Sequence, residues 1–300
     1  MTADLFDEEL ELPDQRSESR YNALVGLDDV KSAIQQNAAV ILDPDSLRNW
    51  SQQHYDHVLP VVASFAERTP LFVFAGDVGT GKSTLAESFA QPIAKQHGID
   101  ITVARLSLRA RGTGAVGEMT KLLGEAFDEI IGRGRQLTKD QALVLVIDEA
   151  DAIAQSRELG QMHHEDRAGV NALIRGIDAV AAEGRPILVV MCTNRLGALD
   201  PAIRRRAAAE FEFRRPNQEQ RVALIAAALV GTGITDHDIQ QLAKLAGEAD
   251  GRTYGHTYSD LVNRVLPAAV LAAYPDRALD SEVVASALGK HPPTPPFTSQ

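Results

Sequence analysis

The stretch Pro70–Thr84, PLFVFAGDVGTGKST, constrains the fold of this chain more than any other. An apolar run, Leu71–Ala75, leads into the pattern G-x-x-x-x-G-K-[ST], which begins at Gly76 and ends at Ser83. Glycines in such a loop let backbone N–H groups turn inward around an anion, and the helix that follows directs its positive end to the same place. The pattern therefore predicts a phosphate-binding loop between a buried strand and a helix.

Two side chains of this loop indicate how a nucleotide is held. Lys82 supplies a mobile ammonium for the β- and γ-phosphates, and the Ser83 hydroxyl is placed to ligate Mg²⁺. A glycine turn that happens to contain a lysine is the alternative, but strand, loop and helix follow here in the required order. The residues that we predict to contact the nucleotide phosphates are Asp77, Val78, Gly79, Thr80, Gly81, Lys82, Ser83 and Thr84.

A second chemical signal follows the apolar run Ala142–Ile147, which ends directly in Asp148 and Glu149. In phosphate-loop NTPases an acidic residue at this place holds the Mg²⁺ shell. We assign Asp148 to Mg²⁺ and Glu149 to the general base that polarises the attacking water; an ordinary helix-cap pair is the alternative. Residues 148–151 spell DEAD, but an RNA helicase needs two α/β domains, and no second α/β pattern follows Pro216.

Apolar runs alternate with helical patterns through the first two thirds of the chain. Continuous Val/Leu/Ile runs are typical of strands buried on both faces of a parallel sheet, and their alternation with helices predicts a doubly wound α/β fold. After Pro216 the pattern is helical only. The predicted strands are Leu71–Ala75, Ile101–Leu106, Ala142–Ile147 and Ile187–Cys192. The predicted helices are Asp28–Leu42, Ser46–Glu67 (one helix or a pair), Ser83–His97 (open to a kink at Pro92), Glu118–Ile131, Gln218–Val230, Asp236–Ala246, Ser259–Tyr274 and Ser281–Leu288.

These patterns divide the chain into an acidic, disordered tail (1–20), an α/β ATPase domain (21–215), a small helical domain (216–290) and an unstructured proline-rich tail (291–300). The aromatic residues near Trp50 are predicted to pack in a core or against another subunit. The net charge of −11 argues against a general nucleic-acid binder. A single cysteine, Cys192, excludes an internal disulfide, and no apolar run is long enough to span a membrane. We expect a cytoplasmic protein.

Two polar features follow the last predicted strand. The amide of Asn194 is placed to hydrogen-bond the γ-phosphate or the attacking water, although asparagine is also a common turn residue. Leu199–Arg206, LDPAIRRR, contains three consecutive arginines. They form either a solvated basic turn or a finger that reaches the nucleotide of a neighbouring subunit, because a planar guanidinium matches phosphate oxygens. A finger that acts in trans implies a ring of subunits.

The phosphate loop, LVLVIDEAD, MCTNR, LDPAIRRR and the helical C-terminal part occur in one order that resembles the AAA+ ATPases, and among them the protein-remodelling AAA clade. The resemblance extends over roughly Leu24–Leu288. It implies ATP with Mg²⁺ as cofactors, a hexameric ring, and a lid at Pro216–Leu288. It further implies Gly26 and Leu27 at the adenine, Asn194 as the first sensor, and Arg205 and Arg206 as finger candidates.

Two groups within that clade are similar to the chain. AIRRR resembles the katanin and vacuolar-sorting ATPases. VNALIRGID at Val170–Asp178, the ungapped LDPAIRRRAAAEFEF, and RVLP at Arg264–Pro267 are more similar to the pachytene-checkpoint family, which remodels HORMA-domain proteins. Compact bacterial members of that family serve in anti-phage signalling operons, and this chain has a similarly short build.

The chain departs from the family pattern at three places. An aromatic residue usually precedes the Gly-Glu pair of the central-pore loop, but here Ala115–Val116 precede Gly117–Glu118, which puts the grip on a threaded polypeptide in doubt. Asp260 or Leu261 occupies the position of an arginine sensor in the lid. Arg204 leaves the finger assignment open by one residue.

The resemblance predicts an ATP-hydrolysing homo-hexamer that remodels or disassembles a HORMA-domain protein, with neither nucleic acid nor membrane as a partner. The alternative is a nucleic-acid-associated AAA+ loader, or a helper in transposition or replication. That alternative requires a basic pore lining, for which the candidates are Arg105, Arg109, Arg111, Arg133 and Arg135.

Overall fold

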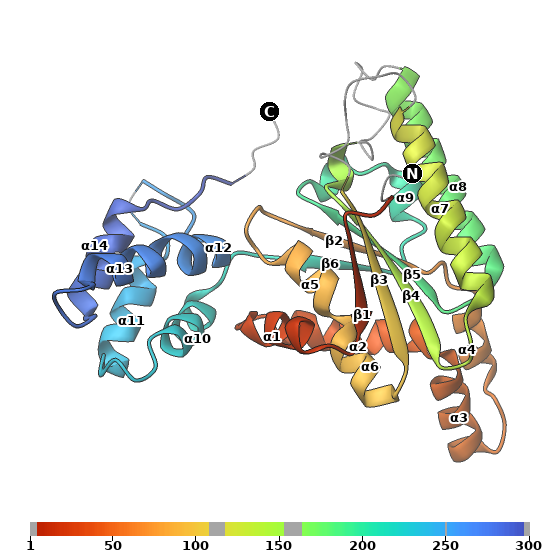
Figure 1. Cartoon of the computed structure of the whole chain (residues 1–300), viewed down its shortest axis with the longest axis horizontal. Helices are drawn as coiled ribbons and strands as arrows, with labels where there is room; N and C mark the ends of the chain where they lie inside the picture. Colours follow the sequence, from red (N-terminus) through yellow and green to blue (C-terminus); the bar gives the residue numbers. More distant parts are fainter. Residues whose placement is uncertain (1–4, 108–117, 153–163, 250, 297–300) are drawn as a thin grey trace. The chain divides into compact units, whose positions relative to one another are not determined.

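A six-stranded sheet is the main feature of the computed structural model, which describes residues 5–107, 118–152, 164–249 and 251–296 (Figure 1). The strand order is β1-β3-β4-β5-β2-β6, and the pairs β3/β4, β4/β5 and β2/β5 are parallel. The strands are β1 (Glu8–Leu12), β2 (Leu71–Gly76), β3 (Asp100–Ser107), β4 (Gln141–Asp148), β5 (Ile187–Thr193) and β6 (Ala209–Phe213). The four predicted strands and the α/β fold class are confirmed.

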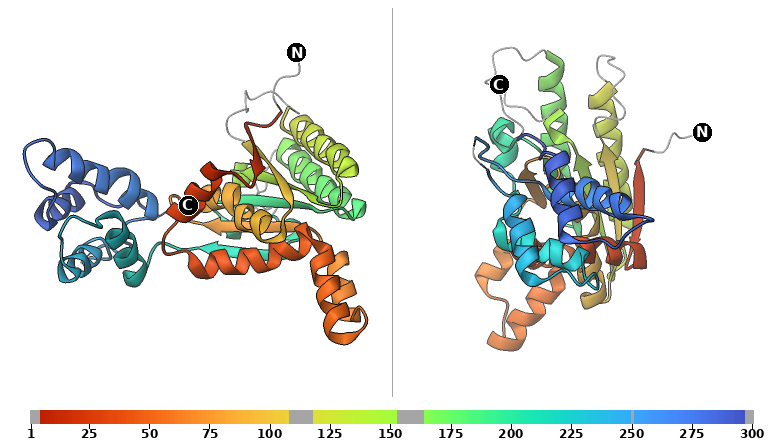
Figure 2. Two further views of the ribbon diagram at one scale, coloured as in Figure 1. Left: turned by 60° about the horizontal axis from the view of Figure 1, so that its bottom comes forward. Right: turned by 90° about the vertical axis from the view of Figure 1, so that its left-hand side faces the viewer.

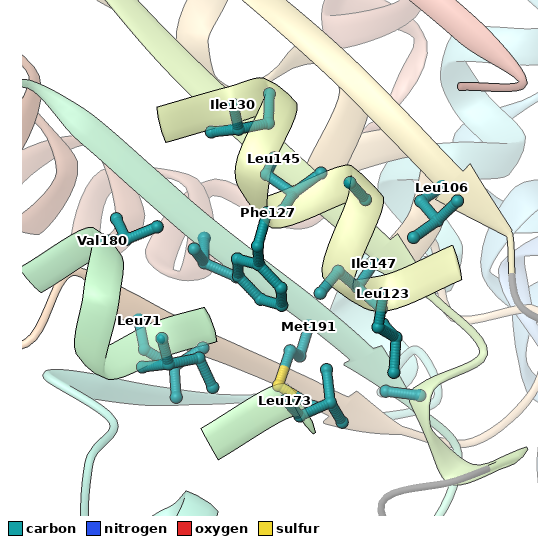
Figure 3. Close-up of a cluster of buried hydrophobic side chains, with 14 of the residues drawn as sticks. Leu71, Leu106, Leu123, Phe127, Ile130, Leu145, Ile147, Leu173, Val180 and Met191 are labelled. Carbon is teal, nitrogen blue, oxygen red and sulfur yellow. The ribbon is translucent and has the colours of Figure 1, made fainter. Parts of the chain in front are cut away.

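Helices α7 (Glu118–Gln136) and α8 (His164–Glu183) cover one face of the sheet. Phe127 and Leu173 from these helices pack with Leu145 of β4 and Met191 of β5 in one buried cluster (Figure 3). β4 and β5 are apolar almost throughout because both of their faces are buried. α7 ends at Gln136, five residues beyond the end predicted for this helix at Ile131.

Helices α2 (Asp28–Leu42), α5 (Lys82–Ser88) and α6 (Ala90–His97) lie on the opposite face, as the turned views show (Figure 2). Phe74 of β2 meets Phe89 edge to face, with ring centroids 6.2 Å apart. The helix predicted over Ser83–His97 is interrupted at Phe89. The interruption precedes Pro92, which has no N–H to donate to the carbonyl of Ser88.

The prediction of a disordered N-terminal tail is wrong for the described part of residues 1–20. Strand β1 pairs antiparallel with β3, from Glu8 opposite Arg105 to Leu12 opposite Ile101, and α1 (Gln15–Ala23) follows. Leu12 is 2% exposed, and Arg133 binds the carboxylate of Glu9 at 3.0 Å. Glu9 therefore has a basic partner, while Phe6 and Leu12 contribute to the core.

The region between α2 and β2 is helical, as predicted, in the form of α3 (Pro44–Tyr55), α4 (Pro60–Ala63) and the short 3-10 helix Ser64–Glu67. The aromatic residues of α3 do not pack in the core of the chain. Trp50 and Tyr55 are 43% and 47% exposed and contact each other edge to face. The other short elements are the 3-10 helices Ala150–Ala152 and Leu196–Ala198 and helix α9 (Pro201–Arg204).

The C-terminal region is helical, as predicted. Its elements are α10 (Gln218–Ala228), α11 (Asp236–Leu245), α12 (Tyr258–Asp260), the π-helical turn Leu261–Val265, α13 (Leu266–Ala273) and α14 (Ser281–Lys290). The predicted helix Ser259–Tyr274 thus contains a π turn just before Pro267, which lacks an N–H for the regular helical bond. The prediction that the C-terminal tail is unstructured is wrong at Thr294, whose backbone N–H donates to Oδ2 of Asp260 at 3.0 Å.

The chain forms two compact units that do not follow a single cut in the sequence. One consists of Met1–Tyr21, Val30–Ala75 and Ser83–Glu212, and the other of Asn22–Asp29, Gly76–Lys82 and Phe213–Gln300. The second unit thus joins the predicted adenine segment, most of the phosphate loop and the C-terminal helices. Among the described residues, no helix is both long and apolar enough to cross a membrane.

Candidate active site

The ammonium group of Lys82 lies against the backbone of the phosphate loop, and the residue as a whole is 7% exposed. Its Nζ donates to the carbonyl oxygens of Gly76 and Asp77 at 2.9 and 2.8 Å, and the Thr80 hydroxyl donates to the same Asp77 carbonyl at 2.7 Å. Gly79 and Gly81 have φ values of +75° and +95°, which favour glycine. The loop therefore has the turned backbone that the sequence pattern predicts.

An ion pair missed by the sequence reasoning holds this loop within the second unit. Arg215 donates from Nε to Oδ2 of Asp77 at 2.8 Å and from Nη1 to the carbonyl of Gly255 at 2.7 Å. Both charged side chains are largely buried. The one sequence signal was Asp77 itself, because a carboxylate in a loop built for phosphates needs a cationic partner. Nothing in the sequence singled out Arg215 as that partner.

The predicted adenine segment contacts the C-terminal helices of the same unit. Gln220 Nε2 and the Tyr258 hydroxyl both donate to the carbonyl oxygen of Gly26, at 2.7 and 3.0 Å. Burial, with a smaller contribution from Asp28, raises the pKa of Tyr258 to about 12. Leu27 is buried beside Gly81. Gly26 and Leu27 thus belong to the same unit as most of the phosphate loop, and Leu27 lies beside its Gly81.

The start of α12 lies against the phosphate loop. The N–H of Ser259 donates to the carbonyl of Gly79 at 3.0 Å, and an added Cβ on Gly79 would lie 2.7 Å from Oγ1 of Thr257. Asp260, one of the two residues considered for the arginine-sensor position, is 2% exposed and forms a capping box with Thr257 at the start of this helix. Burial favours its neutral form, but hydrogen bonds from Thr294 and Thr257 outweigh that effect and lower the pKa of Asp260 to about 2.

The strand-end acids belong to the first unit, where the carboxylate of Asp148 is fixed on both sides. Its Oδ1 accepts hydrogen bonds from Oγ of Ser83 at 3.1 Å and from the N–H of Glu149 at 2.9 Å. Its Oδ2 faces Nη2 of Arg105 at 3.2 Å. The structure therefore brings the two predicted Mg²⁺ ligands together, although they are 65 residues apart in the chain.

Glu149 has a φ of +54°, which is unusual for a residue with a side chain. Such backbone strain is concentrated at functional sites. Asn194 follows β5, and its N–H donates to Oδ1 of Asp151 at 3.3 Å. β4 and β5 are parallel neighbours, so Glu149 and Asn194 follow strands that end at the same edge of the sheet.

The three consecutive arginines differ in their partners. Arg204 binds the carboxylate of Glu210 through two hydrogen bonds of 3.0 and 2.9 Å, and Arg206 binds Asp178 at 2.7 and 3.0 Å. Arg205 is exposed and has no ion-pair partner in the part of the chain that the structure describes. Of the two candidates named from the sequence, the structure thus leaves Arg205 available to another molecule, while Arg206 is engaged.

The arginines considered for a basic pore have acidic partners where they are described. Arg105 pairs with Glu87 and Asp148, Arg133 with Glu9 and Glu129, and Arg135 with Glu183. Arg109 and Arg111 lie outside the described residues, as do Ala115–Val116 and Gly117 of the expected pore loop. The described part of the chain also contains no cluster of three potential metal-binding side chains.

Comparison with known proteins adds evidence from the whole chain. Residues 72–215 match the model of the AAA family, the ATPase family associated with various cellular activities. The chain is 44% identical to CD-NTase-associated protein 6 of Escherichia coli (strain MS 115-1) over 98% of this chain and 96% of that protein.

Two solved structures are also similar. A chain of the E. coli MS115-1 HORMA:CdnC:Trip13 complex is 43% identical, with a TM-score of 0.90 over 99% of this chain and 100% of that one. Rhizobiales Trip13 is 39% identical, with a TM-score of 0.77 over 97% of this chain and all of that one.

Proposed function

The chain belongs to the AAA ATPase family, and from this premise we propose that it uses ATP hydrolysis to remodel or disassemble a HORMA-domain protein in bacterial anti-phage signalling. It is an ATPase related to Trip13 and to CD-NTase-associated protein 6. The observation that carries the proposal is the match, over nearly the whole chain, to one chain of a complex that contains HORMA, CdnC and Trip13. We further propose a cytoplasmic location.

The second unit supports the part of the proposal that concerns ATP binding. We propose that the backbone of residues 77–81 and Lys82 bind the phosphates, and that Val78, Ser83 and Thr84 complete the contacts. Gly26 and Leu27 would lie at the adenine. Ser83 and Asp148 fit Mg²⁺, because Mg²⁺ prefers oxygen ligands and their oxygens are 3.1 Å apart. When bound, Mg²⁺ neutralises charge that develops on the transferred phosphate.

The chain's own residues would then perform hydrolysis. We propose that the Glu149 carboxylate accepts the proton of the attacking water as general base. The amide of Asn194 would orient that water or the γ-phosphate as the first sensor. The left-handed backbone of Glu149 supports this role. Residues with a side chain keep such a strained conformation only where the surrounding structure imposes it, which occurs mainly at functional sites.

The helical residues 216–290 are proposed to be the lid. The lid contacts Gly26 through Gln220 and Tyr258, and it contacts Gly79 through Ser259. Since these contacts join the lid to segments that would bind the nucleotide, replacing ATP by ADP would change how the lid is held. Such a change is the kind of rigid-body movement that drives partner remodelling in a ring. The pore-loop regions proposed around Val116 and Gln161, both of which lie outside the described residues, would transmit it.

We propose a homo-hexamer in which Arg205 is the finger that completes the site of the neighbouring subunit. An arginine finger contributes about 10³–10⁵ to turnover where it has been measured. Arg205→Ala should therefore nearly abolish hydrolysis in an assembled ring, whereas Arg204→Ala and Arg206→Ala break intramolecular ion pairs and should reduce it less. Steady-state ATP hydrolysis, with ring assembly checked by light scattering, distinguishes the three variants.

A mixing experiment tests whether the finger acts in trans. Lys82→Ala subunits lack a working site but keep Arg205, and Arg205→Ala subunits keep the site but lack the finger. Mixed rings should regain activity that neither variant has alone. Full activity of assembled Arg205→Ala rings would overturn this assignment.

The function itself is tested by comparing two possible partners. The ATPase rate should rise when a HORMA-domain protein in complex with its binding partner is added, and that complex should dissociate only when ATP is hydrolysed. Double-stranded DNA should have no effect, since the described arginines of the alternative pore are paired with carboxylates. Salt-sensitive stimulation by DNA without any effect of HORMA protein would favour the nucleic-acid loader instead.

A further inference from the structure

Arg105 is the residue that fixes the second oxygen of the Asp148 carboxylate. Oδ1 accepts hydrogen bonds from the Ser83 hydroxyl and the Glu149 N–H, and Nη2 of Arg105 lies 3.2 Å from Oδ2. Strand register explains the contact: Ser107 of β3 is opposite Asp148 of β4, and Arg105 is two residues earlier on the same face of β3. Diagonal neighbours on adjacent strands are within reach of a long side chain.

Arg105 is in turn held by a buried carboxylate on the helix that follows the phosphate loop. Its Nη1 lies 3.1 Å from Oε1 of Glu87, which is 7% exposed and comes one helical turn after Ser83. Arg20 of α1 binds the other oxygen of Glu87 at 3.0 Å and lies 3.7 Å from Glu8 of β1. Arg20, Glu87, Arg105 and Asp148 therefore form a chain of alternating charges.

Such a chain restricts the carboxylate more than a single ion pair does. A guanidinium has donors in a rigid planar arrangement, so Arg105 can bind Glu87 and Asp148 together only in a narrow range of positions. The carboxylate plane of Asp148 is then held with Oδ1 toward Ser83. Mg²⁺ requires nearly ideal octahedral geometry, so a small rotation of an oxygen ligand costs affinity.

We propose that Arg105, held by Glu87 and Arg20, is a positioning residue that orients the Asp148 carboxylate for Mg²⁺. The proposal rests on the proposed function, in which Ser83 and Asp148 bind the Mg²⁺ that accompanies ATP. It connects β1 and α1 to the catalytic centre of the ATPase. It also gives Glu87, which belongs to none of the sequence motifs, a role in Mg²⁺ binding.

The test separates orientation from charge. Replacing Arg105 alone would also remove a positive charge near the metal, which by itself strengthens Mg²⁺ binding. The double variant Glu87→Gln/Arg105→Gln removes one charge of each sign, so the net charge is unchanged while the fixed geometry is lost. The matched control is Glu129→Gln/Arg133→Gln, since this pair also bonds at 2.8 Å but does not contact Asp148.

The measurement is the affinity for a fluorescent ATP analogue in excess Mg²⁺ and in excess EDTA. The ratio of the two dissociation constants, the Mg²⁺ enhancement, should fall about tenfold in Glu87→Gln, because a negative charge near the metal is lost and the unanchored Arg105 competes for Asp148. It should fall less, but clearly, in the double variant, and it should stay at the wild-type value in the control.

Affinity in EDTA serves as the internal check of folding. Wild-type affinity in EDTA together with wild-type Mg²⁺ enhancement in both Glu87 variants would overturn the proposal. If the double variant does not bind the ATP analogue in EDTA, the Mg²⁺ enhancement is measured in Arg20→Gln instead. This substitution loosens Glu87 but leaves the Arg105–Asp148 contact in place. A wild-type Mg²⁺ enhancement in Arg20→Gln would again overturn the proposal. Absence of any Mg²⁺ enhancement in the wild type would refute the proposed function instead.

Discussion

Charged side chains hold the strand-end carboxylate Asp148 in the first unit, whereas the phosphate loop in the second unit is held mainly through backbone carbonyl groups. In the first unit, Asp148 is bonded to Ser83 and Arg105, and Arg105 continues to Glu87. In the second unit, the groups that receive hydrogen bonds are the carbonyls of Gly26, Gly76, Asp77 and Gly79. The Asp77–Arg215 ion pair is the exception there.

This difference follows from the roles proposed for Asp148 and for the phosphate loop. A carboxylate that ligates a metal must be held at a fixed rotation, and opposite charges hold it most firmly. A loop that binds phosphates must instead direct its N–H groups at the ligand, so its carbonyls are left to accept bonds from neighbouring elements. Substitutions around Asp148 and Glu149 should therefore affect Mg²⁺ binding and hydrolysis, and those around the phosphate loop should affect the affinity for the nucleotide itself and the folding stability.

Glu149→Gln is the substitution that we expect to have the largest effect. Loss of the general base should lower ATP turnover by about 10²–10⁴ while ATP binding is retained. Measuring hydrolysis and nucleotide affinity on the same preparation separates the two. The control is Glu129→Gln, which changes a carboxylate on α7 that pairs with Arg133. Normal turnover in Glu149→Gln would exclude its assignment as the base.

Gly79→Ala tests the contact between the phosphate loop and α12. An added Cβ would lie 2.7 Å from Oγ1 of Thr257 and 2.9 Å from Cβ of Ser259, so we expect a loss of about tenfold or more in ATP affinity. Gly98→Ala is a close match, because Gly98 has a φ of +66° and open space around it. Both variants should lose about 1 kcal/mol of folding stability from backbone strain. Equal ATP affinities in the two would contradict the contact's importance.

Asp260→Asn tests the buried carboxylate of the lid. Because the pKa of Asp260 in the folded chain is about 2, below its unfolded value of 3.8, its charge stabilises the fold above about pH 4 by an amount on the order of 2 kcal/mol. This contribution is lost as the pH falls from about 4 to about 2. Urea unfolding should therefore show a stability difference between wild type and variant at pH 7 that shrinks toward pH 2. A difference independent of pH would show that the charge is unimportant.

Tyr258→Phe should have the smallest effect, about 1 kcal/mol, from the hydrogen bond lost to Gly26. The pKa of Tyr258 is raised to about 12, so in the wild type the stability from its neutral hydroxyl is present below pH 10 and is lost between about pH 10 and 12. The variant should lack that alkaline loss. Tyr274→Phe is the control, because Tyr274 is 75% exposed. Identical alkaline unfolding of wild type and Tyr258→Phe would refute the prediction.

The sequence by itself determined the parts of this protein that depend on local spacing. The phosphate loop, the four buried strands and the helical C-terminal region could all be predicted, because a glycine pattern, a continuous apolar run or a helical period is complete within a few residues. For the same reason Asp148 and Glu149 could be placed at a strand end. The N-terminal strand β1 was missed, since its acidic composition resembles that of a disordered segment until Arg133 and β3 are adjacent to it.

Only the tertiary structure decided which side chains meet. Arg105 and Asp148 are 43 residues apart, and Asp77 and Arg215 are 138 apart, so their contacts depend on strand order, register and the packing of separate segments. The same holds for the three consecutive arginines of LDPAIRRR, among which the sequence left the finger assignment open. Glu210 and Asp178 engage Arg204 and Arg206, and Arg205 is left exposed. The sequence identifies which residues have suitable chemistry for a site. Which of them are held in intramolecular ion pairs depends on residues from other parts of the chain, which only the fold brings together.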